Sequence, residues 1–289
     1  MMILSFHPCF EADHNIICAG REPCQDDLNA IKSADAVILS QGCGKKLYFM
    51  ARENCRNVFP DFDAKFKYPN KTGQTILFNK INVAHPDTEI YNAVSRFYDK
   101  YGTSPGVLPF SFPFVFKFDW GGEGDNVFLI KSFKDLTDIL LKAEKYESTG
   151  QKGFLIQEYI SCGNKSLRAV IINSRIITYW RVRKDSEPFF TSISKGSTID
   201  HHMEPQLQKA AALSLKKFCK KTEINLAGFD FLFSDNKKNK EPIFLEINYF
   251  FGRKGLGGSK EYYKILLTEI QKWIDSLKLT HNKPHKKTG

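Results

Sequence analysis

The sequence predicts an α/β protein made of several lobes, and three features of the chain support this fold class. Strand and helix signals alternate over the first part of the chain, as they do where helices join the strands of a parallel sheet. Later strand signals come in pairs joined by short loops, which is typical of antiparallel hairpins. The length of 289 residues exceeds one ordinary domain and allows two or three compact lobes.

A small leading α/β domain is expected over residues 1–69. The strand and helix signals in it are Met2–Phe6, Asp26–Ser33 and Asp35–Ser40. Strand, helix and strand at this spacing predict a βαβ unit with a parallel sheet.

The segment Gly42-Cys43-Gly44-Lys45 follows this last strand and invites comparison with a phosphate-binding P-loop. That motif needs glycine five positions before Gly44, where Leu39 stands, and Ser or Thr where Lys46 stands. The P-loop reading is therefore rejected.

The elements after residue 70 are predicted from apolar periodicity and capping residues. Helical spacing covers Lys71–Asn79 and Glu89–Tyr101, with Gly102 as the helix end. Ser132 is expected to cap a helix that runs to about Tyr146, because Asp135 stands at its third position. The other predicted strands are Phe112–Phe118, Asn126–Ile130, Phe154–Ile160, Leu167–Asn173, Arg175–Arg183, Gly228–Phe233 and Pro242–Asn248, and the other helices are Glu204–Thr222 and Tyr262–Leu277.

The composition limits the class of protein. Hydrophobic residues make up 42% and charged residues 26%, so a core can form and general disorder is excluded. No apolar run reaches the roughly 18–20 residues of a membrane span. Residues Met1–His7 lack a basic start and favour a first strand over a secretory signal. The seven cysteines contain no CxxC pair, so we expect reduced thiols and a cytoplasmic protein.

The charge balance favours anionic partners. Lys and Arg number 42 against 32 Asp and Glu, a net charge of +10. Nucleotides, phosphorylated metabolites, nucleic acid or an acidic protein would suit this charge, and a lysine-rich solvated surface is the alternative. A metal site from His7, Cys9, Cys18 and Cys24 fits no familiar ligand spacing.

A glycine-rich loop over Asp119–Asp125 separates two predicted strands, and Lys117 comes just before it. Strand, loop and strand form a hairpin, so this is not the dinucleotide-binding fingerprint. Backbone amides in such a loop can approach phosphate oxygens closely, and a nearby ammonium completes an anion site. Glycine hairpins are common, so this feature alone identifies nothing.

Two acids and an amide are expected on facing strands. Asp230 lies within an apolar strand, and Glu246 and Asn248 are two apart on the next one, so these two share a face. Two buried carboxylates repel each other unless a cation lies between them. Oxygen ligands of this kind suit Mg²⁺ that is shared with phosphates. Edge-strand acids facing water are the alternative, which the apolar neighbours disfavour.

Two further segments carry candidate binding groups. The strand that leads into Gln157, Glu158, Tyr159 and Ile160 can offer main-chain groups to the edge of an adenine. Arg168, with Arg181 and Arg183 beyond it, supplies cations for an anionic intermediate. Ordinary surface charge is the alternative for these arginines.

In this order the motifs resemble the ATP-grasp superfamily, and most of all its branch of RimK-like carboxylate–amine ligases. The resemblance covers roughly Lys71 to Leu256. It implies an ATP-grasp region over residues 70–289 after the leading domain. The middle lobe would span about 107–158 with the glycine-rich loop, the C-terminal lobe about 159–277 with the metal ligands, and 278–289 would be a frayed tail.

The resemblance also implies roles for single positions. Those matched to ATP are Lys71, Lys117, Gly121, Gly122, Gly124, Gln157, Glu158, Tyr159 and Ile160. Those matched to Mg²⁺ or Mn²⁺ are Asp230, Glu246 and Asn248. Arg168 and, with a poorer match, Arg181 would hold the reacting group. Two positions depart from the family: Ser166 stands where Asp is frequent, and Ser192 stands where Asn is expected.

The implied reaction transfers the γ-phosphoryl group of ATP to a carboxylate, which an amine or a thiol then attacks. The acceptor would be a small molecule, a peptide or a protein, and no membrane is implied. An ATP-grasp kinase and a nucleotide-binding regulator without ligase activity are the alternatives. A nucleic-acid-binding module is disfavoured, because the basic residues are scattered and no RRM, KH or zinc-finger signature is present.

Overall fold

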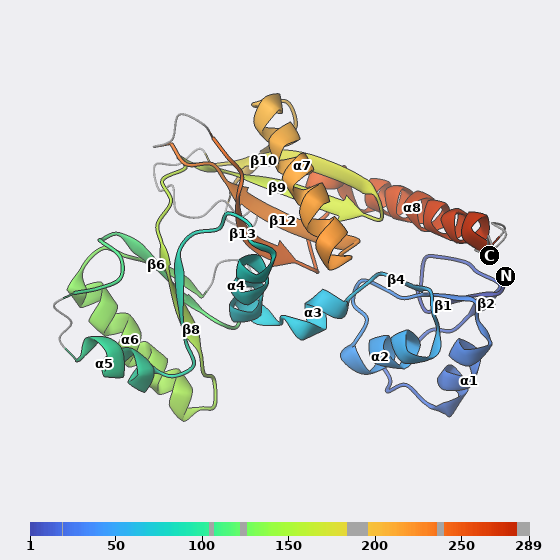
Figure 1. Cartoon of the computed structure of the whole chain (residues 1–289), viewed down its shortest axis with the longest axis horizontal. Coiled ribbons are helices and arrows are strands. Elements are labelled where there is room, and N and C mark those ends of the chain that lie inside the picture. The colour runs from blue at the N-terminus through green and yellow to red at the C-terminus, as the bar shows by residue number, and fades with distance from the viewer. Residues whose placement is uncertain (19, 104–106, 122–125, 184–195, 236–239, 282–289) are drawn as a thin grey trace, which may run out of the picture.

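Three sheets organise the computed structural model, which describes residues 1–18, 20–103, 107–121, 126–183, 196–235 and 240–281. The sheet nearest the C-terminus lies between the other two, with the leading sheet on one side and the middle sheet on the other (Figure 1). The chain therefore has the mixed α/β architecture that the sequence predicts.

The leading sheet is parallel, as predicted, with strand order β2-β1-β3-β4. Its strands β1, β2, β3 and β4 are Ile3–Ser5, His14–Asn15, Ala36–Ile38 and Val58–Phe59, and its helices α1, α2 and α3 are Gln25–Ser33, Lys45–Asn54 and Asp63–Lys67. All three residues of β3 are buried, because a parallel sheet is covered on both faces.

The middle sheet is antiparallel, with order β5-β8-β6-β7. Strands β5, β6, β7 and β8 are Thr88–Tyr91, Phe114–Phe118, Val127–Ile130 and Phe154–Glu158, and helices α5 and α6 are Val94–Tyr101 and Phe133–Ser148. The predicted cap of α6 is confirmed, since the Ser132 hydroxyl accepts a hydrogen bond from the Asp135 amide at 3.2 Å.

The prediction of one helix over Glu89–Tyr101 is wrong in its first part. Thr88–Tyr91 is strand β5, which pairs with β8, and the helix begins at Val94. Tyr91 stacks on Phe154 with ring centroids 5.1 Å apart, a contact between distant segments that helical spacing cannot reveal. Gly102 ends α5 as predicted, with φ of +76°.

The C-terminal sheet is antiparallel, with order β11-β10-β9-β12-β13. Strands β9, β10, β11, β12 and β13 are Lys165–Ile172, Arg175–Val182, Thr198–Asp200, Leu226–Leu232 and Ile243–Asn248. The helices of this part are α7 (Pro205–Thr222), the short 3₁₀ helix η2 (Lys254–Leu256) and α8 (Gly258–His281). Residues 278–281 continue α8 where a frayed tail was expected, and 282–289 lie outside the described residues.

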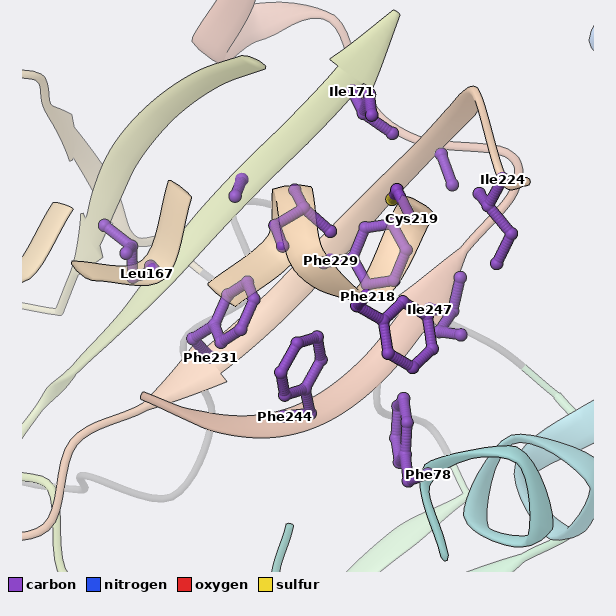
Figure 2. Packing of buried hydrophobic residues seen from close by; sticks show 14 of the residues in the cluster. Phe78, Leu167, Ile171, Phe218, Cys219, Ile224, Phe229, Phe231, Phe244 and Ile247 are labelled. Carbon is purple, nitrogen blue, oxygen red and sulfur yellow. The ribbon is translucent and has the colours of Figure 1, made fainter. Parts of the chain in front are cut away.

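One face of this sheet packs on α7 and on α4 (Asn70–Ile81). Figure 2 shows Phe218 of α7 against Phe229 and Phe244 of the sheet, with Phe78 of α4 beside them. The ring centroids of Phe78 and Phe244 are 5.6 Å apart. The opposite face packs on α8 through a separate core. Helix α4 is thus anchored on the C-terminal sheet, and the position of Lys71 in its first turn follows from this anchor.

A β-bulge interrupts the pairing of β12 with β13. Asp230 stands opposite Glu246, but the next residue, Phe231, stands opposite Phe244, so Leu245 is the extra residue. Phe244 belongs to the core under α7, whereas Leu245 lines a pocket on the other face. The bulge therefore places the consecutive residues Leu245 and Glu246 on the same side of the sheet.

Within the described ranges, no helix is both long enough and apolar enough to cross a membrane.

Candidate functional site

A narrow pocket of about 100 Å³ lies between the middle and C-terminal sheets. This volume is below the roughly 300–1,000 Å³ of complete ligand sites, so the slot suits one flat part of a larger ligand. Its lining residues are Pro86, Val115, Lys117, Val127, Gln157, Glu158, Tyr159, Ile160, Cys162, Leu232 and Leu245. The four predicted adenine-contacting residues and Lys117 thus meet at one place. Val115 was missed, although it shares a strand face with Lys117 at a spacing of two.

The segment after β8 is held by its neighbour β5. The Gln157 side-chain amide donates to the Thr88 hydroxyl at 2.8 Å, and the Glu158 amide donates to the Asp87 carbonyl at 2.8 Å. The Glu158 side chain is exposed. These two hydrogen bonds hold the start of this segment in place beside the slot.

Lys117 lies near charges from two other elements. Burial lowers the pKa of Lys117 to about 8, the Glu246 carboxylate opposes this shift, and the Lys71 ammonium adds to it. Residues far apart in the sequence, on β6, α4 and β13, therefore interact electrostatically here. Burial from water is the main cause of this shift, because it disfavours the charged form of the ammonium group.

Lys71 ties the start of α4 to the glycine-rich loop. Its Nζ donates to the carbonyls of Trp120 at 3.3 Å and Gly121 at 3.1 Å, while burial lowers its pKa. In return, the Asp119 carboxylate accepts a hydrogen bond from the Thr72 amide at 2.8 Å. Asp119 was not singled out in the sequence, because it is 47 residues from Thr72 along the chain and reaches the start of α4 only in the fold. A carboxylate at the start of a helix is favoured by the helix dipole.

Glycine is required at position 121. Its φ is +82°, and a Cβ there would lie 2.3 Å from the Asn126 side-chain nitrogen. The predicted loop residues Gly122 and Gly124 lie outside the described residues.

Asp230 is the centre of a buried network on the same face of the sheet. Arg168 binds it through both carboxylate oxygens, at 2.6 and 3.0 Å, and Arg181 donates to it at 2.7 Å. Asn248 donates its side-chain amide to Asp230 at 3.2 Å. Burial raises the pKa of Asp230, but the two guanidinium groups lower it by more, so the carboxylate stays ionised. Asp230, Asn248 and the two predicted arginines therefore meet.

Ser166, which stands where the family frequently has Asp, contacts one of the two buried arginines. The Ser166 hydroxyl accepts hydrogen bonds from the Nε of Arg181 at 3.2 Å and from its Nη2 at 2.9 Å. Ser166 thereby helps to hold this arginine against Asp230. The other departure, Ser192, lies outside the described residues.

The expectation of two carboxylates that repel each other without a metal is wrong. Glu246 stands opposite Asp230, but Arg168, Arg181, Lys71 and Lys117 surround the pair and outnumber it. The local charge is therefore positive rather than negative. Within the part of the chain that the structure covers, the Glu246 side chain makes no hydrogen bond.

The donors at this place suit a hard cation. Glu246 offers a carboxylate, and Asn248 offers its side-chain oxygen because its nitrogen faces Asp230. Mg²⁺ prefers such oxygen ligands and usually completes its shell with phosphate oxygens and water. Among the described residues, no group of three or more His, Cys, Asp and Glu side chains could hold a metal alone, so phosphates would have to supply part of the shell.

A second polar cluster lies where the leading lobe meets the loop after β13, and sequence reasoning missed it. The Gln41 side chain donates to the Tyr249 carbonyl at 3.0 Å and accepts from the Tyr262 hydroxyl at 3.1 Å. The guanidinium group of Arg253 lies 4.8 Å from the Tyr262 ring and 4.6 Å from the Tyr263 ring. No described carboxylate forms an ion pair with Arg253. The signal for this loop was the run of glycines between Asn248 and α8.

The same loop touches the Asp230 network. A Cβ on Gly255 would lie 2.0 Å from the ring of Tyr179, so the loop backbone packs directly on this ring. Arg168 and Arg181 affect the pKa of Tyr179, which burial raises. The loop that carries Arg253 is thereby held against Tyr179 by a contact that only glycine allows.

Two antiparallel sheets around one slot, behind a parallel leading sheet, are the architecture of the ATP-grasp proteins. A family model described as a RimK-like ATP-grasp domain matches residues 70–274. The chain belongs to this family.

Solved structures share the fold at low sequence identity. The D-alanine–D-alanine ligase of Bacillus anthracis is 12% identical with a TM-score of 0.57, and the match covers 92% of this chain and 86% of that one. A RimK domain ATP-grasp protein of Sphaerobacter thermophilus is 11% identical with a TM-score of 0.54, covering 83% and 82%. An N5-carboxyaminoimidazole ribonucleotide synthetase solved with ADP is 13% identical with a TM-score of 0.55, covering 82% and 59%.

One similar sequence is an uncharacterized protein, the "MG012 homolog" of Mycoplasma pneumoniae. It is 24% identical over 140 residues, which is 48% of this chain and 44% of that protein. The match thus spans less than half of that relative.

Proposed function

We propose that this protein is an ATP-dependent ligase that activates a carboxylate as an acyl phosphate for attack by an amine. The observation that carries the proposal is the meeting of Lys71, Lys117 and Glu246, from three distant segments, beside a narrow slot between the middle and C-terminal sheets. Family membership and the ligases among the solved structures of similar fold support the same reaction class.

Each group has a task that follows from its charge. The adenine would occupy the slot against the main chain of residues 158–160, and the phosphates would extend toward Lys71 and Lys117. Burial lowers the pKa of both ammonium groups, and in their charged form they would neutralise the phosphates as ADP forms. Glu246 and Asn248 would hold Mg²⁺ or Mn²⁺, which would supply charge compensation for the phosphates when bound; Asp230, whose two oxygens already accept hydrogen bonds from Arg168, Arg181 and Asn248, would hold these groups in place beside the metal. Arg168 and Arg181 would position Asp230 and add positive potential beside the reacting group.

The reaction has two bond exchanges. A carboxylate oxygen of the substrate bonds to the γ-phosphorus while the bond between that phosphorus and the bridging oxygen of ADP breaks. The amine nitrogen then bonds to the acyl carbon, phosphate leaves, and the amine proton passes to phosphate or solvent. No protein nucleophile is needed in this sequence.

The polar cluster around Arg253 is the place we assign to a carboxylate of the substrates. Arg253 lacks an ion-pair partner among the described residues, and it lies beside the start of α8, whose first amides favour an anion. His7 is buried beside it, and its Nδ1 accepts from the Cys9 amide at 3.1 Å, which leaves the other ring nitrogen to carry the proton.

The test measures ADP release with Mg·ATP against pooled carboxylic acids, with and without pooled amino acids and amines. A ligase requires both an acid and an amine for full turnover, and a condensed product appears by mass spectrometry. ADP formed with a phosphorylated product and no amine requirement would indicate a kinase instead. Nucleotide binding with no turnover under any condition would favour a regulator.

A further inference from the structure

A second and larger groove lies on the face of the C-terminal sheet that carries α7 and α4. It measures about 760 Å³, within the range of complete ligand sites. Its lining residues are Ile81, Asn82, Val83, Ala84, Ser214, Lys217, Phe218, Lys220, Lys221, Glu241, Pro242 and Phe244. The proposed reaction uses none of these residues.

The rim of this groove is basic. Lys217, Lys220 and Lys221 are exposed on the last turns of α7, and Glu241 is the one carboxylate among the lining residues. Lys221 donates to the Ile81 carbonyl at 3.4 Å, so it is turned toward α4 and across the groove. No ion pair with a described carboxylate neutralises these three lysines.

The floor of the groove is apolar. Half-buried Ile81, Val83 and Pro242 present apolar surface to it, above the buried rings of Phe218 and Phe244. An apolar floor under a basic rim matches an occupant that has apolar side chains on one side and carboxylates on the other.

A backbone segment separates the groove from the nucleotide slot. The Ala84 carbonyl accepts a hydrogen bond from the Phe244 amide at 2.8 Å, which holds the segment on the edge of β13. Ala84 lines the groove, whereas Pro86, two residues on, lines the slot. An occupant of the groove would therefore not overlap with ATP.

We infer that this groove is a docking site for an acidic peptide segment of a partner protein, one that alternates carboxylate and apolar side chains. Alternation suits an extended peptide, whose successive side chains point to opposite sides. Nucleic acid fits less well, because the aromatic rings are buried and offer no stacking surface. The inference does not depend on the ligase reaction, but its expectation for Mg·ATP rests on the nucleotide lying in the slot, as proposed above.

The experiment measures fluorescence anisotropy of a labelled eight-residue peptide of alternating glutamate and leucine at low salt. We expect saturable binding to the wild-type protein that excess Mg·ATP does not displace. The variant K217E/K221E should bind about tenfold more weakly, because two attractive charges become repulsive. A peptide with serine in place of leucine should also bind more weakly, since it leaves the floor uncovered.

The matched control is K134E/K145E, which reverses two exposed lysines of α6 and changes the net charge by the same amount. It should bind like wild type. Equal loss in the control variant, displacement by Mg·ATP, or tighter binding of a single-stranded oligonucleotide that depends on Lys217 and Lys221 would each overturn the inference. Absence of peptide binding to the wild-type protein at low salt would overturn it as well.

Discussion

Two groups of charged side chains share one face of the C-terminal sheet, one around Asp230 and one around Glu246. They differ in how many hydrogen bonds the protein donates to the central carboxylate. Around Asp230, two arginines and Asn248 provide direct hydrogen bonds to both carboxylate oxygens. Around Glu246, by contrast, Lys117 and Lys71 interact through charge alone, and the Glu246 carboxylate accepts no hydrogen bond from any described residue. A network that is complete in the protein stabilises the fold, whereas an incomplete one has capacity left for a ligand.

This comparison predicts that Asp230 matters most for stability. Asp230→Asn removes the counter-charge of two buried guanidinium groups and should lower the free energy of unfolding by about 3–5 kcal/mol. Urea unfolding of the metal-free protein measures this. An unchanged free energy of unfolding in Asp230→Asn would show that the network is not structural.

Glu246 should matter most for turnover. Glu246→Gln keeps the shape but removes the charge, so ADP formation should fall by about 10²–10³-fold while the free energy of unfolding changes much less than in Asp230→Asn. The control is Glu241→Gln, an exposed acid near the same strand, which should keep wild-type turnover. Near wild-type turnover in Glu246→Gln would remove this residue from the metal site.

Lys117 should contribute to nucleotide binding. Lys117→Ala deletes one charged contact with the phosphates and should weaken binding of Mg·ATP by about 1–3 kcal/mol. Titration calorimetry measures the affinity, with Lys131→Ala as an exposed control. Equal affinities of Lys117→Ala and wild type would place the phosphates elsewhere.

The buried ammonium group of Lys117, beside Glu246, should also make the free energy of unfolding depend on pH. The pKa of Lys117 is about 8 in the folded protein, below its ordinary value of 10.5. Between these two values the unfolded chain binds more protons than the folded one, so stability rises with pH across this window. Relative to Lys117→Met, the ligand-free wild type should gain about 1–2 kcal/mol from pH 7.5 to 9.5. Parallel pH profiles of the two proteins in urea unfolding would contradict this.

Local signals in the sequence were sufficient for many elements. Ser132 and Asp135 predicted the cap of α6, and Gly102 predicted the end of α5. Period-two spacing placed Glu246 and Asn248 on one face of β13, which agrees with their neighbours in the structure. These features depend on residues a few positions apart, so the sequence contains them directly.

Only the tertiary structure shows which distant segments contact each other. Thr88–Tyr91 has helical spacing but forms a strand because β8 pairs with it. The bulge at Leu245, the two arginines on Asp230 and the position of Arg253 beside the leading lobe all depend on partners from other strands or lobes. The sequence by itself determined which residue types carry charge and which strand faces they occupy. Which charges neutralise each other was decided by the packing of three sheets, because that choice depends on distances between groups that the chain brings together only on folding.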